Sequence, residues 1–361
     1  MEVSTSIADF TAAELDDLGD VLFGRPFLSF VEAEHAGRAE PHYFHLRDEN
    51  GLLAFAPGYI YRKPVPFTFR LEDFVTAGAL LNPDSRYLVL YAPIRLRSRV
   101  FARTGEPRRT FLRAVTGWAA EQGLTAVVLP FVLGSDTDLR EDLSASGFHS
   151  AFYEGDFFLP VRGGDLDDFL PTLGAGPRKQ FRNDINRLRR SDTTVGEIDD
   201  LGPLADDLAA QHNALMDRYH RPEPEFDATS FRRFGALVPN RKVVIAREQG
   251  EAVGFAISAY GHQVFHLLRY GRRPDADDHA RIYSNLVYVE SVRMALATGC
   301  RRVHFGKASH RAKVLRGCHF EEGIVYALMI DEARDRSLAE LFPRLDRNNR
   351  EVFDQKCRGL A

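Results

Sequence analysis

The order of predicted helices and strands repeats between the two halves of this chain, and this repeat limits the fold more than any other feature. In the first half a helix ends at Gly123, and a strand (125–131), a helix (137–145) and a long strand (148–161) follow. In the second half a helix ends at Gly299, and a strand (301–305), a short helix (309–316) and a last strand (324–330) follow in the same order. The repeat predicts two copies of one α/β module.

A strand hairpin with a recognisable turn precedes each copy. Strands 43–46 and 51–61 flank Asp48-Glu-Asn-Gly51, and strands 241–248 and 252–260 flank Gln249-Gly-Glu251. A third strand (263–270) and a helix (281–298) complete the second half. We therefore expect an α/β (α+β) fold of two tandem modules, 1–163 and 196–361.

A basic helical segment, 164–195, is predicted to connect the two modules. Pro177 suits the first turn of a helix, and arginines run from Arg178 to Arg190. One interpretation is a solvated connecting helix. The other is a surface that faces phosphates, because the glycines near Pro177 leave a helix N-terminus open to anions and arginine pairs well with phosphate. Composition does not decide between them.

Length and charge narrow the class of protein. A chain of 361 residues exceeds one comfortable core, which agrees with two modules. Its 47 Lys plus Arg against 51 Asp plus Glu argue against a general nucleic-acid binder but allow a local basic patch. The three cysteines show neither metal-ligand nor disulfide spacing, so we expect a cytoplasmic protein with no metal site. No leader and no apolar run of roughly 20 residues is evident, so no membrane insertion is expected.

The loops after the repeated strand differ in chemistry between the two halves. The first half has Gly134-Ser-Asp136, whereas the second has Gly306-Lys307 and a basic helical turn that carries His310, Lys313 and Arg316. In a helix, His310 and Lys313 share one face. Ligands of open α/β sheets bind beyond the carboxyl ends of strands, which is where this turn lies. An ordinary solvated turn is the alternative, but the difference between the halves favours a site in the second module.

Several stretches resemble a known family. They are Arg25-Pro-Phe-Leu28, Ala56-Pro-Gly-Tyr-Ile60, Tyr91-Ala-Pro93, Arg97-Ser-Arg-Val-Phe101, Arg269-Tyr-Gly271 and Phe305-Gly followed by His310-x-x-Lys313-x-x-Arg316-Gly317. Together with the element order, they resemble the FemAB-like family of peptidoglycan biosynthesis/recognition proteins, with tandem acyl-CoA N-acyltransferase (GNAT-like) modules. The resemblance spans most of the chain and is most specific in the basic turn.

The resemblance implies transfer of an acyl or aminoacyl group to an amine, with no tightly bound cofactor. The large activated donor would be acyl-CoA or aminoacyl-tRNA. GNAT enzymes that bind CoA usually carry a glycine-rich loop, but residues 272–279 contain no glycine, which favours aminoacyl-tRNA. The family is also expected to have an acidic residue where this chain has Asn285, so a carboxylate base is absent there. The partners implied are a small-molecule, peptide or cell-wall-type acceptor and, for an RNA-borne donor, tRNA; the oligomeric state is left open.

Acyl transfer needs a held donor, a deprotonated amine and stabilisation of an oxyanion, and each candidate side chain suits one of these tasks. Lys307 or Lys313 would hold a phosphate or the oxyanion, and Arg316, beside Gly317, would bind phosphate with its planar fork. His310 would relay protons near neutral pH. Arg269, at a strand end, would bind an acceptor carboxylate.

Three tyrosines and one asparagine complete the candidate set as substrate contacts: Tyr270, Tyr283, Asn285 and Tyr288. Packing in the core is the alternative for at least two of the tyrosines. The first hypothesis for the whole chain is therefore an N-acyltransferase, with His310, Lys313 and Arg269 as catalytic residues. The alternative is a non-catalytic module that recognises a phosphorylated or carboxylated ligand.

Overall fold

The structure is a computed structural model of the chain. It describes residues 1–62, 71–75, 80–81, 84–94, 97–102, 105–218, 226–276, 279–307 and 309–357. The chain forms two compact units, each with its own buried apolar core. Unit 1 comprises Met1–Leu18, Phe23–Gly155 and Glu321–Arg358, and unit 2 comprises Gly19–Leu22, Asp156–Phe320 and Gly359–Ala361.

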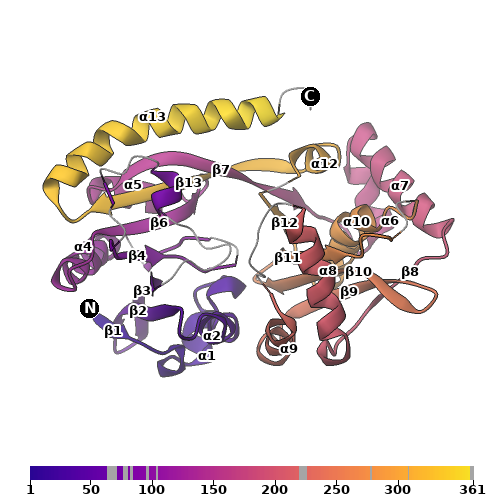
Figure 1. Cartoon of the computed structure of the whole chain (residues 1–361), viewed down its shortest axis with the longest axis horizontal. Helices are drawn as coiled ribbons and strands as arrows, with labels where there is room; N and C mark the ends of the chain where they lie inside the picture. The colour runs from indigo at the N-terminus through magenta and orange to yellow at the C-terminus, as the bar shows by residue number, and fades with distance from the viewer. Residues whose placement is uncertain are drawn as a thin grey trace. The chain divides into compact units, whose positions relative to one another are not determined.

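Unit 1 is built on a mixed sheet with the strand order β1-β2-β3-β4-β6-β13-β7, and β5 pairs with β3 (Figure 1). Its strands are β1 (Glu2–Ser4), β2 (Ala39–Asp48), β3 (Gly51–Tyr61), β4 (Tyr87–Leu90), β5 (Phe101–Ala102), β6 (Ala126–Leu133), β7 (His149–Pro160) and β13 (His319–Met329). Its helices are α1 (Ala12–Asp16), α2 (Arg25–Glu34), α3 (Leu71–Phe74), α4 (Gly105–Glu121), α5 (Thr137–Ala145) and α13 (Glu332–Cys357). All eight residues of β6 are buried, as its uninterrupted apolar sequence predicts for a central strand.

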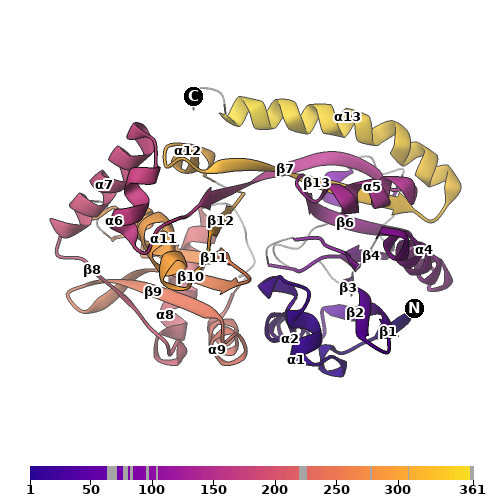
Figure 2. The ribbon, with the colours of Figure 1, turned by 180° about the vertical axis from the view of Figure 1, so that it is seen from behind.

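Unit 2 carries the strands in the order β7-β12-β11-β10-β9-β8. Its own strands are β8 (Thr194–Glu197), β9 (Arg241–Glu248), β10 (Glu251–Gly261), β11 (Val264–Arg272) and β12 (Arg302–Gly306). Its helices are α6 (Leu166–Phe169), α7 (Ala175–Arg189), α8 (Ala205–Asp217), α9 (Ala228–Leu237), α10 (Ile282–Ser284), the π-helical segment η5 (Asn285–Glu290), α11 (Ser291–Ala297) and α12 (His310–Val314). Figure 1 shows α8 in front of this sheet, and Figure 2 shows α11 in front of it from behind.

The two units exchange parts of their last strands. The end of β7 pairs with β12 inside unit 2, although β7 begins in unit 1. The strand that ends the second repeat, β13, pairs with β6 inside unit 1, and α13 follows it there. The contact units therefore do not follow the chain in order, whereas the predicted segments 1–163, 164–195 and 196–361 do; those chain-order boundaries stay a prediction.

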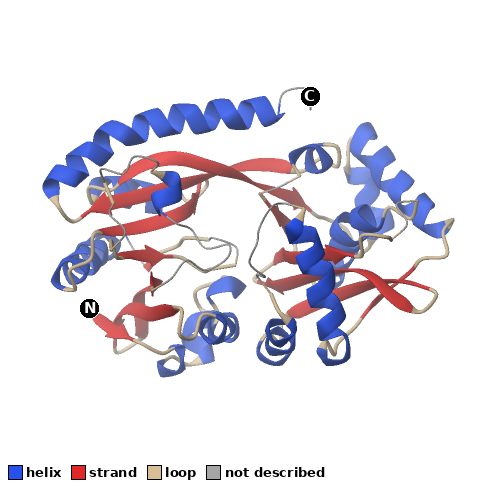
Figure 3. Ribbon diagram, in the orientation of Figure 1, coloured by secondary structure: helices blue, strands red, loops and turns tan. Residues whose placement is uncertain are grey.

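Most of the predicted elements are present, and Figure 3 shows their distribution along the ribbon. The sequence predicts a short helix near 228–237 and a strand over 241–248, and α9 and β9 have these limits. An Asp227 cap with Ser230 begins α9, and the Gln249-Gly250 turn ends β9. The proline-rich sequence after residue 61 predicts a loose segment up to about residue 85, and part of that segment lies outside the described residues. Helix α13, strand β8 and the π-helical segment were not predicted from the sequence.

None of the helices in the described ranges, α13 included, combines the length and the apolar character needed to cross a bilayer.

Candidate functional site

The sheet of unit 2 opens between two parallel strands. Residues 264–266 of β11 pair with residues 302–304 of β12, and within the described ranges their pairing goes no further. Strand β11 then continues to Arg272 and β12 ends at Gly306, so the carboxyl ends of the two strands are not paired with each other. A strand edge that leaves its neighbour can bind an extended ligand through backbone hydrogen bonds. We refer to this feature as the β11–β12 opening.

A β-bulge in β11 sets which side chains face the two sides of this opening. The register with β10 shifts there, so that Leu267 pairs with Ser258 and Arg269 pairs with Ile257, and Leu268 is the extra residue. Such a bulge reverses the alternation of side chains along the strand. Tyr270 consequently lies on the side of α10 and η5, whereas Arg269 lies on the side of α8 and α9.

The three predicted tyrosines lie close together on the side of the sheet that is covered by α10 and η5. The rings of Tyr270 and Tyr283 lie 5.1 Å apart, and those of Tyr283 and Tyr288 lie 5.8 Å apart. The hydroxyl groups of Tyr283 and Tyr288 are 3.3 Å apart. Burial, reinforced by Tyr283, raises the pKa of Tyr288 well above its ordinary value, so this phenol stays protonated and can donate a hydrogen bond.

Arg316 is held in a buried ion pair rather than exposed to solvent. Its guanidinium donates to the carboxylate of Asp184 on α7 at 2.6 Å and 3.1 Å, and to the hydroxyl of Ser284 at 2.7 Å. It also lies 4.3 Å from the ring centre of Tyr288. Asp184 and Arg316 are 1% and 4% exposed, which makes their mutual neutralisation essential. The pair therefore joins the basic helix α7 to the turn that carries α12.

Gly317 makes a second junction between the same two elements. Its φ of +76° lies in the left-handed region. A Cβ atom at this position would lie 3.2 Å from the ring of Pro177, in the first turn of α7. Gly317 is therefore needed for both its backbone conformation and its close packing.

Lys313 and His310 meet at the ring of Phe157 on β7. Lys313 is 2% exposed, and its ammonium group donates a 2.5 Å hydrogen bond to the carbonyl of Gly306, at the end of β12. The ammonium lies 5.2 Å from the centre of the Phe157 ring, and the His310 ring lies 5.4 Å from it. Lys307 follows β12 directly and is half-buried. These three predicted residues thus surround the end of β12.

Arg269 lies on the other face of the sheet from this group. Its guanidinium sits 4.8 Å from the ring centre of Phe226, and it donates to the carbonyl of Leu268. His212 of α8 is 3.1 Å from the carbonyl of Tyr270 on the same face. The structure therefore brings together His310 and Lys313, but it places Arg269 across the sheet from them.

Two histidines and one aspartate that lie close together on the Arg269 face of the sheet were not predicted as site residues from the sequence. His304 Nδ1 lies 2.9 Å from the Asp156 carboxylate, and the His304 ring stacks on His266 at 5.3 Å. All three residues are at most 4% exposed. The alternation of β12, in which Val303 and Phe305 face the core, would have put His304 on the opposite face, but nothing in the sequence links it to Asp156, 148 positions earlier.

Asn285 is completely buried and serves as a hydrogen-bond donor. Its amide nitrogen donates to the backbone carbonyls of Asp184, Ala280 and Arg281 at 2.9–3.2 Å. A carboxylate here would face three carbonyl oxygens, so the site needs an amide. The residue therefore fixes α7 against the start of α10.

The two cysteines near the basic turn have the environment of packed thiols. Burial raises the pKa of Cys318 to about 12 and also raises the pKa of Cys300. Both stay protonated near neutral pH, which is unfavourable for a nucleophile.

Comparison with known proteins bears on the fold in which this site lies. The sequence profile of the acetyltransferase (GNAT) domain matches residues 177–314, which lie within unit 2. No curated protein sequence matches the chain. The crystal structure of FemX is similar over 90% of this chain and 97% of FemX, with 12% identity and a TM-score of 0.62.

Two further solved structures share the fold over most of their lengths. One is the C-terminal domain of a putative lysylphosphatidylglycerol synthetase from Agrobacterium fabrum, with 11% identity, coverage of 94% of this chain and 97% of that one, and a TM-score of 0.57. The other is L-PGS from Bacillus licheniformis, with 11% identity, coverage of 88% and 91%, and a TM-score of 0.53. The chain therefore shares the fold of FemX, in agreement with the predicted FemAB-like tandem GNAT fold, and residues 177–314 of unit 2 match the acetyltransferase (GNAT) domain.

Proposed function

We propose that this protein is an N-acyltransferase that transfers an acyl or aminoacyl group from acyl-CoA or aminoacyl-tRNA to the amine of a small-molecule, peptide or cell-wall-type acceptor. The observation that carries the proposal is the β11–β12 opening with its bulge at Leu268, inside the segment that matches the GNAT domain. The carboxyl ends of β11 and β12 are not paired with each other, so their facing edges offer backbone groups to the extended arm of a donor, and charged side chains lie on both faces of the opening.

In this proposal the donor lies on the side of α10 and α12, and the acceptor approaches from the side of α8. Lys307 and Lys313 supply positive charge near the end of β12, where an oxyanion would form. Arg269 provides a cation for an acceptor carboxylate on the opposite face. Arg316 and Gly317 act as positioning residues, because their side chain and backbone hold α7 against the turn that carries α12.

The chemistry is a direct attack of a neutral amine on the acyl carbonyl. A carbon–nitrogen bond forms, the carbonyl oxygen takes the negative charge, and collapse of this intermediate breaks the bond to the thiol of CoA or the ribose hydroxyl of tRNA. The attacking amine loses one proton and the leaving group gains one. His310 is the proposed carrier of that proton, since imidazole exchanges protons near neutral pH.

The donor is identified by incubating the protein with labelled acyl-CoAs and with charged tRNAs, with and without RNase, in the presence of amine acceptors. We expect labelled amide product from one donor class. RNase-sensitive transfer would assign aminoacyl-tRNA, and RNase-insensitive transfer from CoA would assign acyl-CoA. Binding of a donor without any product from either donor class would overturn the acyltransferase hypothesis and favour a non-catalytic recognition module.

Replacing Lys313 is expected to abolish transfer. We expect K313A to lower kcat/KM by about 100-fold or more, in line with the loss of an oxyanion donor. Both K313A and K313M leave the Gly306 carbonyl without its buried donor, but K313M keeps the side-chain volume and creates no cavity, so it serves as the second variant. K179A, an exposed lysine on α7, is the control. A folded K313M protein with unchanged turnover would remove Lys313 from the site.

A further inference from the structure

A second concave site lies in unit 2 where α7 ends. This pocket of about 550 Å³ is lined by residues from the end of α7, the β9–β10 turn and the loop before α10: Arg187, Arg190, Ser191, Asp192, Thr193, Glu248, Gln249 and His279. We call it the α7 pocket. Its volume falls within the range of roughly 300–1,000 Å³ that is typical of small-molecule sites.

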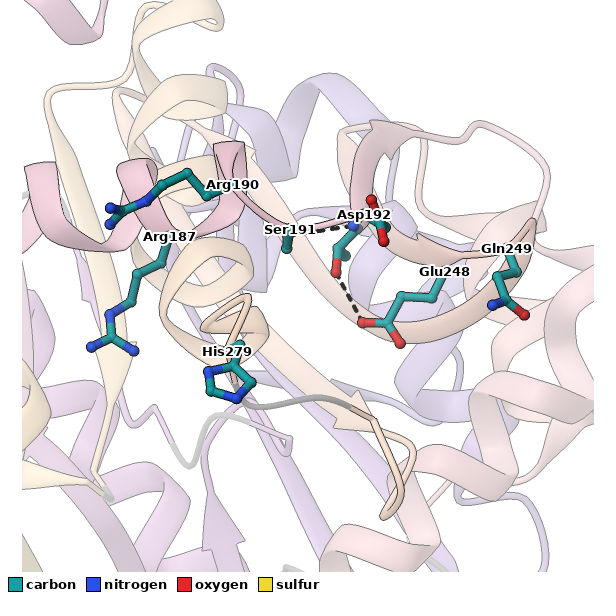
Figure 4. A pocket seen from close by; sticks show the side chains of 8 residues that line it. Arg187, Arg190, Ser191, Asp192, Glu248, Gln249 and His279 are labelled. Carbon is teal, nitrogen blue, oxygen red and sulfur yellow. Dashed lines mark hydrogen bonds between the residues drawn. The ribbon is translucent and has the colours of Figure 1, made fainter.

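The charges of the α7 pocket are separated into two walls. Figure 4 shows Arg187, Arg190 and His279 on one side and Asp192, Glu248 and Gln249 on the other. Among the described residues, Arg187 forms no hydrogen bond or ion pair, and Arg190 donates only to the carbonyl of Asn186. Both guanidinium groups therefore keep donors that can bind an anion in a bidentate manner.

The acidic wall is fixed in place by the fold. The hydroxyl of Thr193 donates to the Glu248 carboxylate at 2.9 Å, which joins the segment after α7 to the end of β9. Gln249 has a φ of +51° in a tight turn with Gly250, so its side chain is presented at a defined position. Carboxylate and amide groups accept hydrogen bonds from ribose hydroxyl and adenine amino groups. The two walls together suit a phosphorylated nucleoside.

The pocket lies at the same end of the sheet as the carboxyl end of β11. Glu248 pairs with Glu251 of β10, and Gly254 of β10 pairs with Arg272, the last residue of β11. His279 lies just before α10, whose Tyr283 contacts Tyr270 on β11. One extended ligand is thus the simplest occupant of both the pocket and the β11–β12 opening.

We propose that the α7 pocket binds the phosphate-bearing adenosine end of the acyl donor, with Arg187, Arg190 and His279 on the phosphates. This inference rests on the proposed acyltransferase function. Acyl-CoA carries a phosphorylated adenosine at the end remote from its acyl group, and aminoacyl-tRNA carries its acyl group on the ribose of a phosphorylated terminal adenosine, so a phosphorylated adenosine is the group that both donors offer to the pocket. The basic end of α7 takes over the phosphate contacts in a chain whose loop 272–279 has no glycine to supply them.

The test is calorimetric binding to the full-length protein, without any turnover. The two probes are adenosine bisphosphate, which represents CoA, and a phosphorylated CCA trinucleotide, which represents the end of tRNA. We expect one of them to bind the wild-type protein, and the probe that binds identifies the source. The double variant R187E/R190E should bind it at least about tenfold more weakly, because charge-assisted hydrogen bonds are lost and repulsion is added.

Arg189 supplies the matched control, because it is exposed on the same helix but does not line the pocket. R189E should bind the probe as the wild-type protein does. Equal weakening by R189E and R187E/R190E would show a general charge effect and would overturn the site, as would the absence of binding by either probe. Transfer activity with unchanged nucleotide binding in R187E/R190E would overturn the pocket while leaving the proposed function intact.

Discussion

Asn285 shows how one buried side chain sets the chemistry allowed around it. Its amide nitrogen faces three carbonyl oxygens, and its own oxygen has no hydrogen-bond partner among the described residues. We expect N285D to lower the free energy of unfolding by about 3 kcal/mol or more at pH 7, since a buried, unpaired carboxylate replaces a donor. Chemical denaturation measures this.

A control variant and the pH dependence of stability show whether the loss in N285D comes from the buried charge or from a change in packing. N240D changes an exposed asparagine in the same way and should alter stability by less than about 0.5 kcal/mol. Burial raises the pKa of a carboxyl group, so acid should protonate the introduced Asp and recover part of the loss. A penalty that is the same at pH 7 and pH 5 would contradict the electrostatic explanation.

At the residue scale the sequence predicts contacts within one turn and misses those across the chain. The spacing of His310 and Lys313 places both on one face, and both contact Phe157. Asp184 lies among arginines in the sequence of α7, which would suggest a solvent-exposed position. In the structure it is 1% exposed and pairs with Arg316, 132 positions away. Such a pair depends on the tertiary fold, which local spacing does not encode.

At the element scale, the junction between α7 and α12 depends on Gly317. We expect G317A to lower the free energy of unfolding by about 2–4 kcal/mol, from the left-handed φ together with a contact on Pro177. Gly299 provides the control, because its φ is +71° and an added Cβ would meet open space. G299A should cost only about 1–2 kcal/mol, the conformational part. Equal losses in the two variants, measured by urea denaturation, would show that the contact with Pro177 contributes nothing.

The elements that the sequence predicted well carry local signals, and those it missed do not. Caps and turns mark α9, β9 and β10, so their limits agree closely with the expected ones. Helix α13 is 26 residues long, but Leu338 and Phe342 are its only buried residues in the described range, so it lacks a wide apolar stripe. The π-helical η5 has the apolar spacing of an ordinary helix, and its extra residue per turn leaves no signature in the sequence.

At the scale of the whole molecule, the repeat predicts the two GNAT-like modules but not how their strands are shared. Both β7 and β13 have the apolar pattern of buried strands, and that pattern is the same whichever neighbour they pair with. Because the two modules are similar in sequence pattern, each of these strands could pair equally well with a strand of its own module or with the corresponding strand of the other module. Only the tertiary structure shows that β13 pairs with β6 and that the end of β7 pairs with β12.

The two units should also differ in their response to acid, and His35 gives the reason. This histidine is buried at the end of α2 in unit 1, where burial, reinforced by Arg38, lowers its pKa to about 4. In an unfolded chain a histidine has a pKa of about 6.5. Protons therefore bind the unfolded state preferentially between these values, and unit 1 should lose roughly 3 kcal/mol of stability as the pH falls from 6.5 to 4.

Trp118 is the single tryptophan and lies in unit 1, so its fluorescence during denaturation at a series of pH values follows that unit. Substitution H35Q removes the titrating group, and its stability should depend less on pH than that of the wild-type protein. H262Q, which changes an exposed histidine of unit 2, should leave the pH dependence unchanged. Since His35 is neutral in the folded state at pH 7, the acid sensitivity arises from proton uptake on unfolding. Parallel pH curves for H35Q and the wild-type protein would contradict this origin.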